Sequence, residues 1–245
     1  MRFRALIFGA VMAGVCGSQT AQAQYHHPVR HYNRQGRAYF RGPLHVTLGV
    51  GTGLYNGDLG NSPGNNFLSP ALSLGVLYRL TPHLHVGTEF AYVALGARDK
   101  TKERGLAFTS NNGLGAVFFR FDLLPDESVF AASQSTAPIF QVYVQGGAGL
   151  LLYDPQSYRG NARSTKGTVF LAPERNDYPA LAGLAPVGAG FSIRLTEQLR
   201  ANVEGNYYFT TTDQLDDVSN LRLGGASASK DGFGTLMLKV EYALK

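Results

Sequence analysis

Three histidines lie close together near the start of the chain, where their imidazoles could bind a transition metal. His26, His27 and His31 form a His-His-x-x-x-His pattern, and imidazole is a common ligand of zinc and copper. However, Pro28 disfavours a continuous helix there, and no nearby carboxylate or cysteine completes a ligand set. We therefore expect a basic tail rather than a metal centre.

Carboxylates form a second group of candidate ligands. Asp213, Asp216 and Asp217 lie within five positions of one another, and calcium requires several oxygen ligands. Their spacing is not that of an EF-hand loop. We expect an ordinary solvated loop, with calcium binding as the alternative.

Catalytic chemistry has few candidates in this sequence. Beyond the tail the histidines are His45, His83 and His85, and none has a serine and an acid placed beside it in a recognisable register. No G-x-S-x-G, P-loop or zinc motif is present. Cys16 is the only cysteine, and it falls within an expected leader, which excludes a disulfide or a catalytic thiol in the mature protein. We expect no enzymatic activity and no cofactor.

The N-terminus has the pattern of a secretory signal peptide. Arg2 and Arg4 precede an apolar stretch from Ala5 to Val15, and Ala21-Gln22-Ala23 is a small-x-small cleavage site. The expected organisation is a leader at 1–23, a basic periplasmic tail at 24–43 and one β-barrel domain at 44–245.

Charge is concentrated at that end of the chain. The net charge of +5 becomes −1 once the two leader arginines and four tail arginines are set aside. The body therefore offers no basic surface for nucleic acid. The tail arginines could contact anionic lipid or a periplasmic partner; they are Arg30, Arg34, Arg37 and Arg41.

The body of the chain alternates between apolar and polar residues with a period of two, which is typical of β-strands. From Leu199 to Phe209 the residues Leu199, Ala201 and Val203 alternate with Arg200, Asn202 and Glu204. Thirty glycines, 15 Phe and 13 Tyr with 16% charged residues suit strands that face lipid on one side and a polar lumen on the other. Strands are expected at 44–54, 71–80, 84–95, 113–122, 139–151, 187–195, 199–209 and 236–244.

The connections between these segments favour a membrane barrel over a soluble β-sandwich, which also alternates. Thr81-Pro82-His83 and Thr196-Glu197-Gln198 are short turns, whereas the connections at the other end are longer and polar, the longest from Leu152 to about Pro186. Only the connection from Leu123 to Pro138 is long on the short-turn side. Long loops at one end and short turns at the other are the outer-membrane pattern. We therefore expect an all-β, eight-stranded antiparallel transmembrane barrel in the outer membrane, with both termini in the periplasm.

Charged residues on the polar faces should lie inside the barrel. An eight-stranded barrel has room inside for side chains but not for a wide channel. Because buried charges are costly unless paired, we expect ion pairs across neighbouring strands, and an ion or proton path is the alternative. The expected lumen residues are Arg79, Glu89, Arg120, Asp122, Arg194, Arg200, Glu204, Lys239 and Glu241.

Three segments resemble a family of Bacteroidetes outer-membrane barrels that includes the PorG component of the type IX secretion system. A glycine-rich strand leads into Tyr55-Asn56-Gly57-Asp58-Leu59, similar to the family's Tyr-x-Gly-Asp-Leu turn. Thr212-Asp213-Gln214-Leu215-Asp216-Asp217 resembles its Thr-Asp-Tyr-Leu-Asp-Asp motif, with Gln214 in place of tyrosine. Tyr153-Asp154-Pro155 resembles its aromatic-Asn-Pro after the fifth strand.

The resemblance implies a non-catalytic barrel that anchors or assembles a secretion complex through periplasmic ring proteins. The sequence leaves two alternatives open, namely a surface barrel with structural or adhesive loops and a narrow pore.

Overall fold

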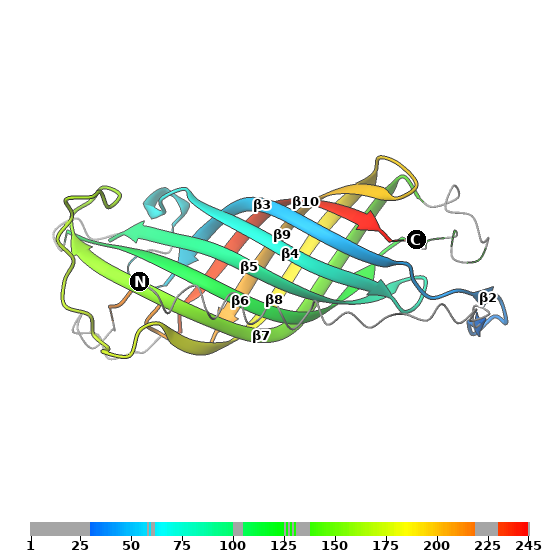
Figure 1. Cartoon of the computed structure of the whole chain (residues 1–245), viewed down its shortest axis with the longest axis horizontal. Helices are drawn as coiled ribbons and strands as arrows, with labels where there is room; N and C mark the ends of the chain where they lie inside the picture. The colour runs from blue at the N-terminus through cyan, green and yellow to red at the C-terminus, as the bar shows by residue number, and fades with distance from the viewer. Residues whose placement is uncertain are drawn as a thin grey trace, which may run out of the picture. The chain divides into compact units, whose positions relative to one another are not determined.

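The computed structural model describes residues 30–57, 59, 62–99, 105–124, 126, 128, 130, 138–218 and 230–244. The expected leader, His26 and His27 lie outside the described residues. Within them, eight long strands follow one another along the chain, after a two-stranded hairpin (Figure 1). The elements are β1 (His31–Tyr32), β2 (Ala38–Tyr39), β3 (Leu44–Asn56), η1 (Pro63–Asn65), β4 (Ser69–Arg79), β5 (Leu84–Arg98), β6 (Leu106–Asp122), β7 (Phe140–Arg159), β8 (Ala180–Arg194), β9 (Leu199–Thr210) and β10 (Gly232–Ala243).

The eight long strands form a closed antiparallel barrel in which β10 pairs with β3. The closing ladder runs from Gly232 opposite Asn56 to Ala243 opposite His45, so neither strand has a free edge. Closure satisfies the backbone without help from solvent, as lipid requires. No helix among the described residues is long and apolar enough to cross a membrane.

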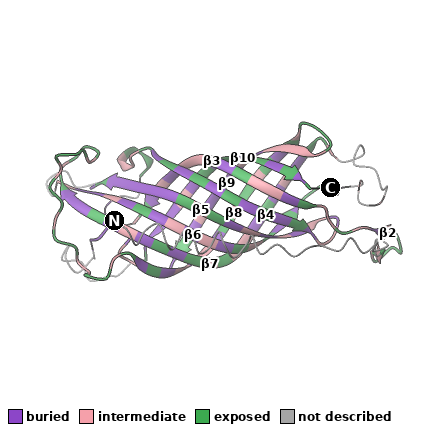
Figure 2. Cartoon of the chain, in the orientation of Figure 1, coloured by how far each residue is buried: buried purple, intermediate pink, exposed green. Residues whose placement is uncertain are grey.

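The side chains alternate between a buried inner face and an exposed outer face (Figure 2). On β4 the alternation is complete from Ser69 to Arg79. The exposed face is strongly apolar: Leu48 is 63% exposed, and Leu150 and Phe90 are also exposed. A soluble protein does not leave so many large apolar side chains in one continuous band, whereas acyl chains would cover them.

Tyrosines mark both edges of this apolar band. Tyr78 and Tyr242 lie on the outer face near the short turns, and Tyr92 and Tyr207 lie on the outer face toward the long loops. Such girdles are typical of the two membrane–water interfaces of a barrel, where an aromatic ring stays in lipid while its hydroxyl reaches polar groups. Tyr92 donates its hydroxyl to Oδ1 of Asn111 at 2.6 Å.

The two short turns are alike in structure as well as in sequence. In the turn between β4 and β5, the amides of Leu80 and Thr81 both donate to the Leu84 carbonyl. In the turn between β8 and β9, Leu195 and Thr196 donate to Leu199 in the same way. In each turn the threonine hydroxyl also accepts the amide of the first residue of the next strand.

Three strands extend at least seven residues beyond their expected bounds. β6 begins seven residues earlier, at Leu106, β7 continues to Arg159, and β8 begins at Ala180. The expected loop from Leu152 to Pro186 was therefore wrong, and Tyr153–Pro155 lie inside β7 instead of after it. The extension of β6 lies past the girdle, where Thr109 and Asn111 end the apolar alternation. The extension of β8 still begins with an exposed apolar residue, Leu181.

Part of the expected basic tail is folded. His31 pairs with Tyr39 and Tyr32 with Ala38 in the β1–β2 hairpin. Tyr39 is buried, and its ring contacts that of Phe130 in the β6–β7 connection with centroids 6.4 Å apart. The tail and this connection therefore meet at the short-turn end.

Candidate functional site

The barrel interior holds a charged layer, whose centre is Lys239 on β10. Its Nζ lies 2.5 Å from Oε2 of Glu89 on β5 and 2.5 Å from Oε1 of Glu204 on β9. All three side chains are buried. Glu204 also accepts hydrogen bonds from the Tyr143 hydroxyl at 2.9 Å and from Nδ2 of Asn206 at 2.6 Å. One ammonium thus connects three strands across the lumen.

Arg120 on β6 forms a second ionic centre nearer the short turns. It donates Nη1 to Glu241 at 3.0 Å and Nε to Asp122 at 3.1 Å. Its guanidinium carbon lies 3.6 Å from the centre of the Tyr143 ring. Glu241 also contacts Nδ1 of His45 at 2.8 Å. Connected networks of this kind are rigid, because moving one member leaves another without a partner.

The remaining expected lumen residues lie at the short-turn rim. Arg79 pairs with Asp126 at 2.8 Å and donates Nε to Nε2 of His85 at 3.1 Å. Arg200 donates to the Ser192 hydroxyl and the Pro138 carbonyl, although its register partner on β10 is Glu241. Arg194 is half-buried at the end of β8. Ion pairs were expected between β9 and β10, and the structure contains one of them, between Lys239 and Glu204.

Sequence reasoning missed the neutral members of this layer. Tyr143, Asn202, Asn206 and Gln145 supply donors to the carboxylates or to one another. The signal was available, because each occupies the polar face of a predicted strand. Their side chains carry no charge, so a pattern of charged residues does not single them out.

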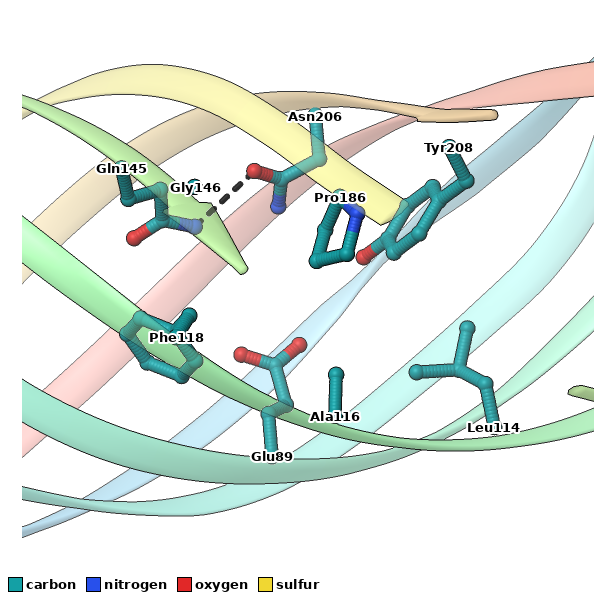
Figure 3. A pocket seen from close by; sticks show the side chains of 9 residues that line it. All are labelled: Glu89, Leu114, Ala116, Phe118, Gln145, Gly146, Pro186, Asn206 and Tyr208. Carbon is teal, nitrogen blue, oxygen red and sulfur yellow. Dashed lines mark hydrogen bonds between the residues drawn. The ribbon is translucent and has the colours of Figure 1, made fainter. Parts of the chain in front are cut away.

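Two small cavities remain within the charged layer. Each has about 10 Å³ of space for water centres, which suits about one water molecule. Figure 3 shows the first, with Glu89 on one wall and the hydrogen-bonded pair Gln145–Asn206 on the other. Neither cavity has room for a substrate or an ion pathway.

An apolar layer fills the barrel toward the long loops. Phe108, Leu151 and Phe233 are fully buried there. Leu215 and Val218, from the connection after β9, belong to the same cluster. We call residues 211–218 the plug segment. Residues 215–218 are buried, so the expectation of an ordinary solvated loop was wrong: the apolar side chains of Leu215 and Val218, three positions apart, pack inside the mouth.

The aspartates of the plug segment make structural contacts. Asp216 and Asp217 are buried, while Asp213 is half-buried. Asp217 accepts the Ser157 hydroxyl at 3.0 Å and the Glu174 amide at 2.9 Å. Burial raises the pKa of its carboxyl above the ordinary value, because desolvation outweighs these bonds. Among the described residues no three His, Cys, Asp or Glu side chains gather as a metal site.

Tyr55 joins the two loop motifs. Its hydroxyl lies 2.7 Å from Oδ2 of Asp216 and 2.9 Å from Oδ1 of Asp231. Asp231 in turn accepts the Leu215 amide, and Leu59 is buried in the same cluster. The structure therefore brings together Tyr55, Gly57, Leu59, Leu215 and Asp216; Asp58 lies outside the described residues.

The histidines considered for catalysis serve structural contacts. His83 stacks on Phe121 with ring centres 5.5 Å apart, and its Nδ1 lies 2.9 Å from the Asp122 carbonyl oxygen. His45 and His85 face the lumen, as expected, and contact Glu241 and Arg79. The absence of catalysis stays a prediction.

Comparisons with known proteins return small outer-membrane barrels. Neisserial surface protein A is 11% identical, with 83% of this chain and 99% of that chain covered and a TM-score of 0.46. Ail of Yersinia pestis, solved with the heparin analogue sucrose octasulfate, is 13% identical over 82% and 97%, with a TM-score of 0.44. The outer membrane enzyme PagL is 12% identical over 82% and 99%, with a TM-score of 0.37.

No protein-family model and no curated protein sequence matches the chain. The fold class is decided by the closed ladder, the apolar outer band and its tyrosine edges. The fold is that of an outer-membrane β-barrel. The resemblance of its loop motifs to the secretion-associated barrels has no support from these comparisons.

Proposed function

We propose that this protein is a non-conducting outer-membrane anchor that docks a periplasmic partner of a secretion complex at its short-turn end. The observation that carries the proposal is the filled interior. A charged layer and an apolar layer lie in series, with cavities of only about one water. A barrel with a filled lumen acts through its ends and its outer wall rather than as a conduit.

The short-turn end offers a defined docking surface. Arg37 lies over the Phe130 ring at 4.2 Å, and Tyr39 packs beside the same ring. Arg30, Arg34 and Arg41 are exposed. The described tail residues 30–43 include no acid, so the hairpin presents a basic surface beside the ring of Phe130, suited to an acidic protein partner.

The resemblance to the PorG family supports assigning that partner to a type IX-like secretion machine. A surface barrel acting through its loops is the second candidate. It is favoured by β5, β6 and β7, which extend past the girdle and raise the loops above the membrane.

Deletion and complementation separate the two candidates. The anchor proposal predicts that deletion abolishes bulk protein secretion, and that a chain with Arg30, Arg34, Arg37 and Arg41 changed to Gln inserts normally but fails to restore it. The matched Arg-to-Lys chain keeps the charge and should restore secretion. Intact secretion in the deletion strain, with only envelope or adhesion defects, would overturn the proposal in favour of the surface barrel.

A further inference from the structure

Exposed charge at the long-loop end is mainly positive: among the described acids there, only Asp177 is exposed, and it is paired with Arg175. The aspartates of this end are mostly turned inward, since Asp99, Asp216, Asp217 and Asp231 are all at most 3% exposed. By contrast Arg98, one of the residues of β5 on the outer face of the barrel, is exposed. Residues 160–173 include Arg163 and Lys166, both exposed, and no acid.

Two of these cations, Arg98 and Arg163, are held by one short segment at the long-loop end of the wall. Arg98 donates Nη2 to the Gly64 carbonyl at 3.1 Å, and Arg163 donates Nη1 to the Leu68 carbonyl at 3.0 Å. The segment 62–68 precedes β4 and lies along the same edge of β5, where Asn66 bridges Ala97 and the Phe67 amide donates to the Gly96 carbonyl. A guanidinium carries five donors, so each bond to a carbonyl orients the group and leaves most of its donors available.

Large apolar side chains accompany these cations. Leu68 is 77% exposed and Val169 is 84% exposed. Phe170 is partly exposed and packs edge-on against Tyr158. We call Arg98, Arg163, Lys166, Leu68, Val169 and Phe170 the outer patch.

The height of the outer patch restricts what can occupy it. Arg98 lies six residues past Tyr92 on β5, about 20 Å along the strand and about 15 Å above the girdle at the usual tilt. The headgroups of a phospholipid leaflet extend only about 5–7 Å beyond the hydrocarbon. The anionic sugars of a glycolipid anchored in the same leaflet extend further than that.

We propose that the outer patch binds the phosphorylated oligosaccharide headgroup of an outer-leaflet glycolipid. The guanidinium groups and the ammonium contact phosphates on the sugars, and Phe170 with its apolar neighbours covers a sugar face. The inference rests on the proposed orientation, in which the long loops face outward. It concerns the opposite end of the barrel from the secretion partner, and it is tested with the protein in nanodiscs, where secretion plays no part.

The test titrates the purified barrel in zwitterionic nanodiscs with deacylated, phosphorylated lipopolysaccharide oligosaccharide, using calorimetry. We compare a variant with Arg98→Gln, Arg163→Gln and Lys166→Gln with a control that carries the same loss of charge at the other end, Arg34→Gln, Arg37→Gln and Arg41→Gln. The outer-patch variant should bind on the order of 10-fold or more weakly, and the control should match the native protein. Dephosphorylated oligosaccharide should bind weakly to all three.

A second variant distinguishes loss of charge from loss of folding. Arg98→Lys with Arg163→Lys keeps both charges, so it should retain binding, and thermal melting in the nanodisc checks that every variant is folded. Equal affinity of the Gln variant and the native protein would overturn the proposal. Equal loss in the control, or equal binding of the dephosphorylated sugar, would also overturn it.

Discussion

Lys239 is a buried charge held by partners on two other strands. Its two carboxylates, on β5 and β9, are buried and cannot regain water without opening the wall. Removing one partner of a buried pair costs far more than replacing the whole group, because the remaining charge has no solvent.

Changing Lys239 to Met should therefore destabilise the barrel by about 3–5 kcal/mol. Urea unfolding in vesicles, followed by tyrosine fluorescence, measures the loss. Adding Glu89→Gln and Glu204→Gln to the same chain should recover much of it, because no uncompensated charge remains. A loss below about 1 kcal/mol in the single variant would show that the network contributes little.

Gly51, on the first strand of the barrel, has no space for a side chain. A Cβ at Gly51 would meet the Leu236 carbonyl and the Met237 side chain of β10. Overpacking against backbone cannot be relieved by a rotamer change. Gly51→Ala should therefore cost about 1–3 kcal/mol or more, whereas Gly205→Ala, where a Cβ meets nothing within 4 Å, should be close to neutral. Equal melting temperatures for the two variants would contradict this explanation.

At the scale of elements, sequence and structure agree where lipid imposes the pattern. The expected strands at 44–54, 84–95 and 199–209 match β3, β5 and β9 at their membrane-spanning parts, because acyl chains demand an apolar residue at every second position. Past the girdle that demand ends. Asn111 and Thr109 continue β6 with no apolar alternation, so periodicity could not place its end.

The plug segment lay beyond sequence reasoning for a related reason. Its aspartates suggest a solvated loop, yet Leu215 and Val218 pack inside the mouth. It forms hydrogen bonds with Tyr55, Ser157 and Asp231. Each of these residues lies at least 16 positions along the chain from the plug residue that it contacts. The alternation of polar and apolar residues predicts the face on which each lumen residue lies. Which of these residues pair with one another depends on the register of the strands in the closed barrel.

Tyr55→Phe tests how the plug segment is held. The substitution removes a hydroxyl bonded to two buried carboxylates, which should cost about 1.5–3 kcal/mol of local stability. We expect faster hydrogen exchange in residues 211–218, with unchanged exchange in β3 and β10. Tyr207→Phe, on the outer face, is the control, because its hydroxyl accepts a hydrogen bond from Asn56 and not from the plug segment. Unchanged exchange in the plug segment would show that the apolar contacts alone hold it closed.

At the scale of the whole molecule, two barriers of different kinds lie in series along the barrel axis. The apolar layer near the loops excludes ions because it offers no ligands, and the charged layer excludes them because each of its groups already has a partner. Either barrier alone suffices, which explains why losing the plug segment should not create a channel.

Planar-bilayer recordings test this arrangement. The native protein should show no conductance steps above the bare bilayer. A chain carrying Leu215→Ser and Val218→Ser, which loosens the apolar layer, should also stay silent, because Lys239 and Arg120 still bridge the lumen with their carboxylates. Adding Lys239→Ala and Arg120→Ala to that chain removes both barriers, and small steps should then appear in the folded fraction. Regular steps from the native protein would show that the interior opens in the membrane, and the filled lumen would then no longer support an anchor that acts through its ends.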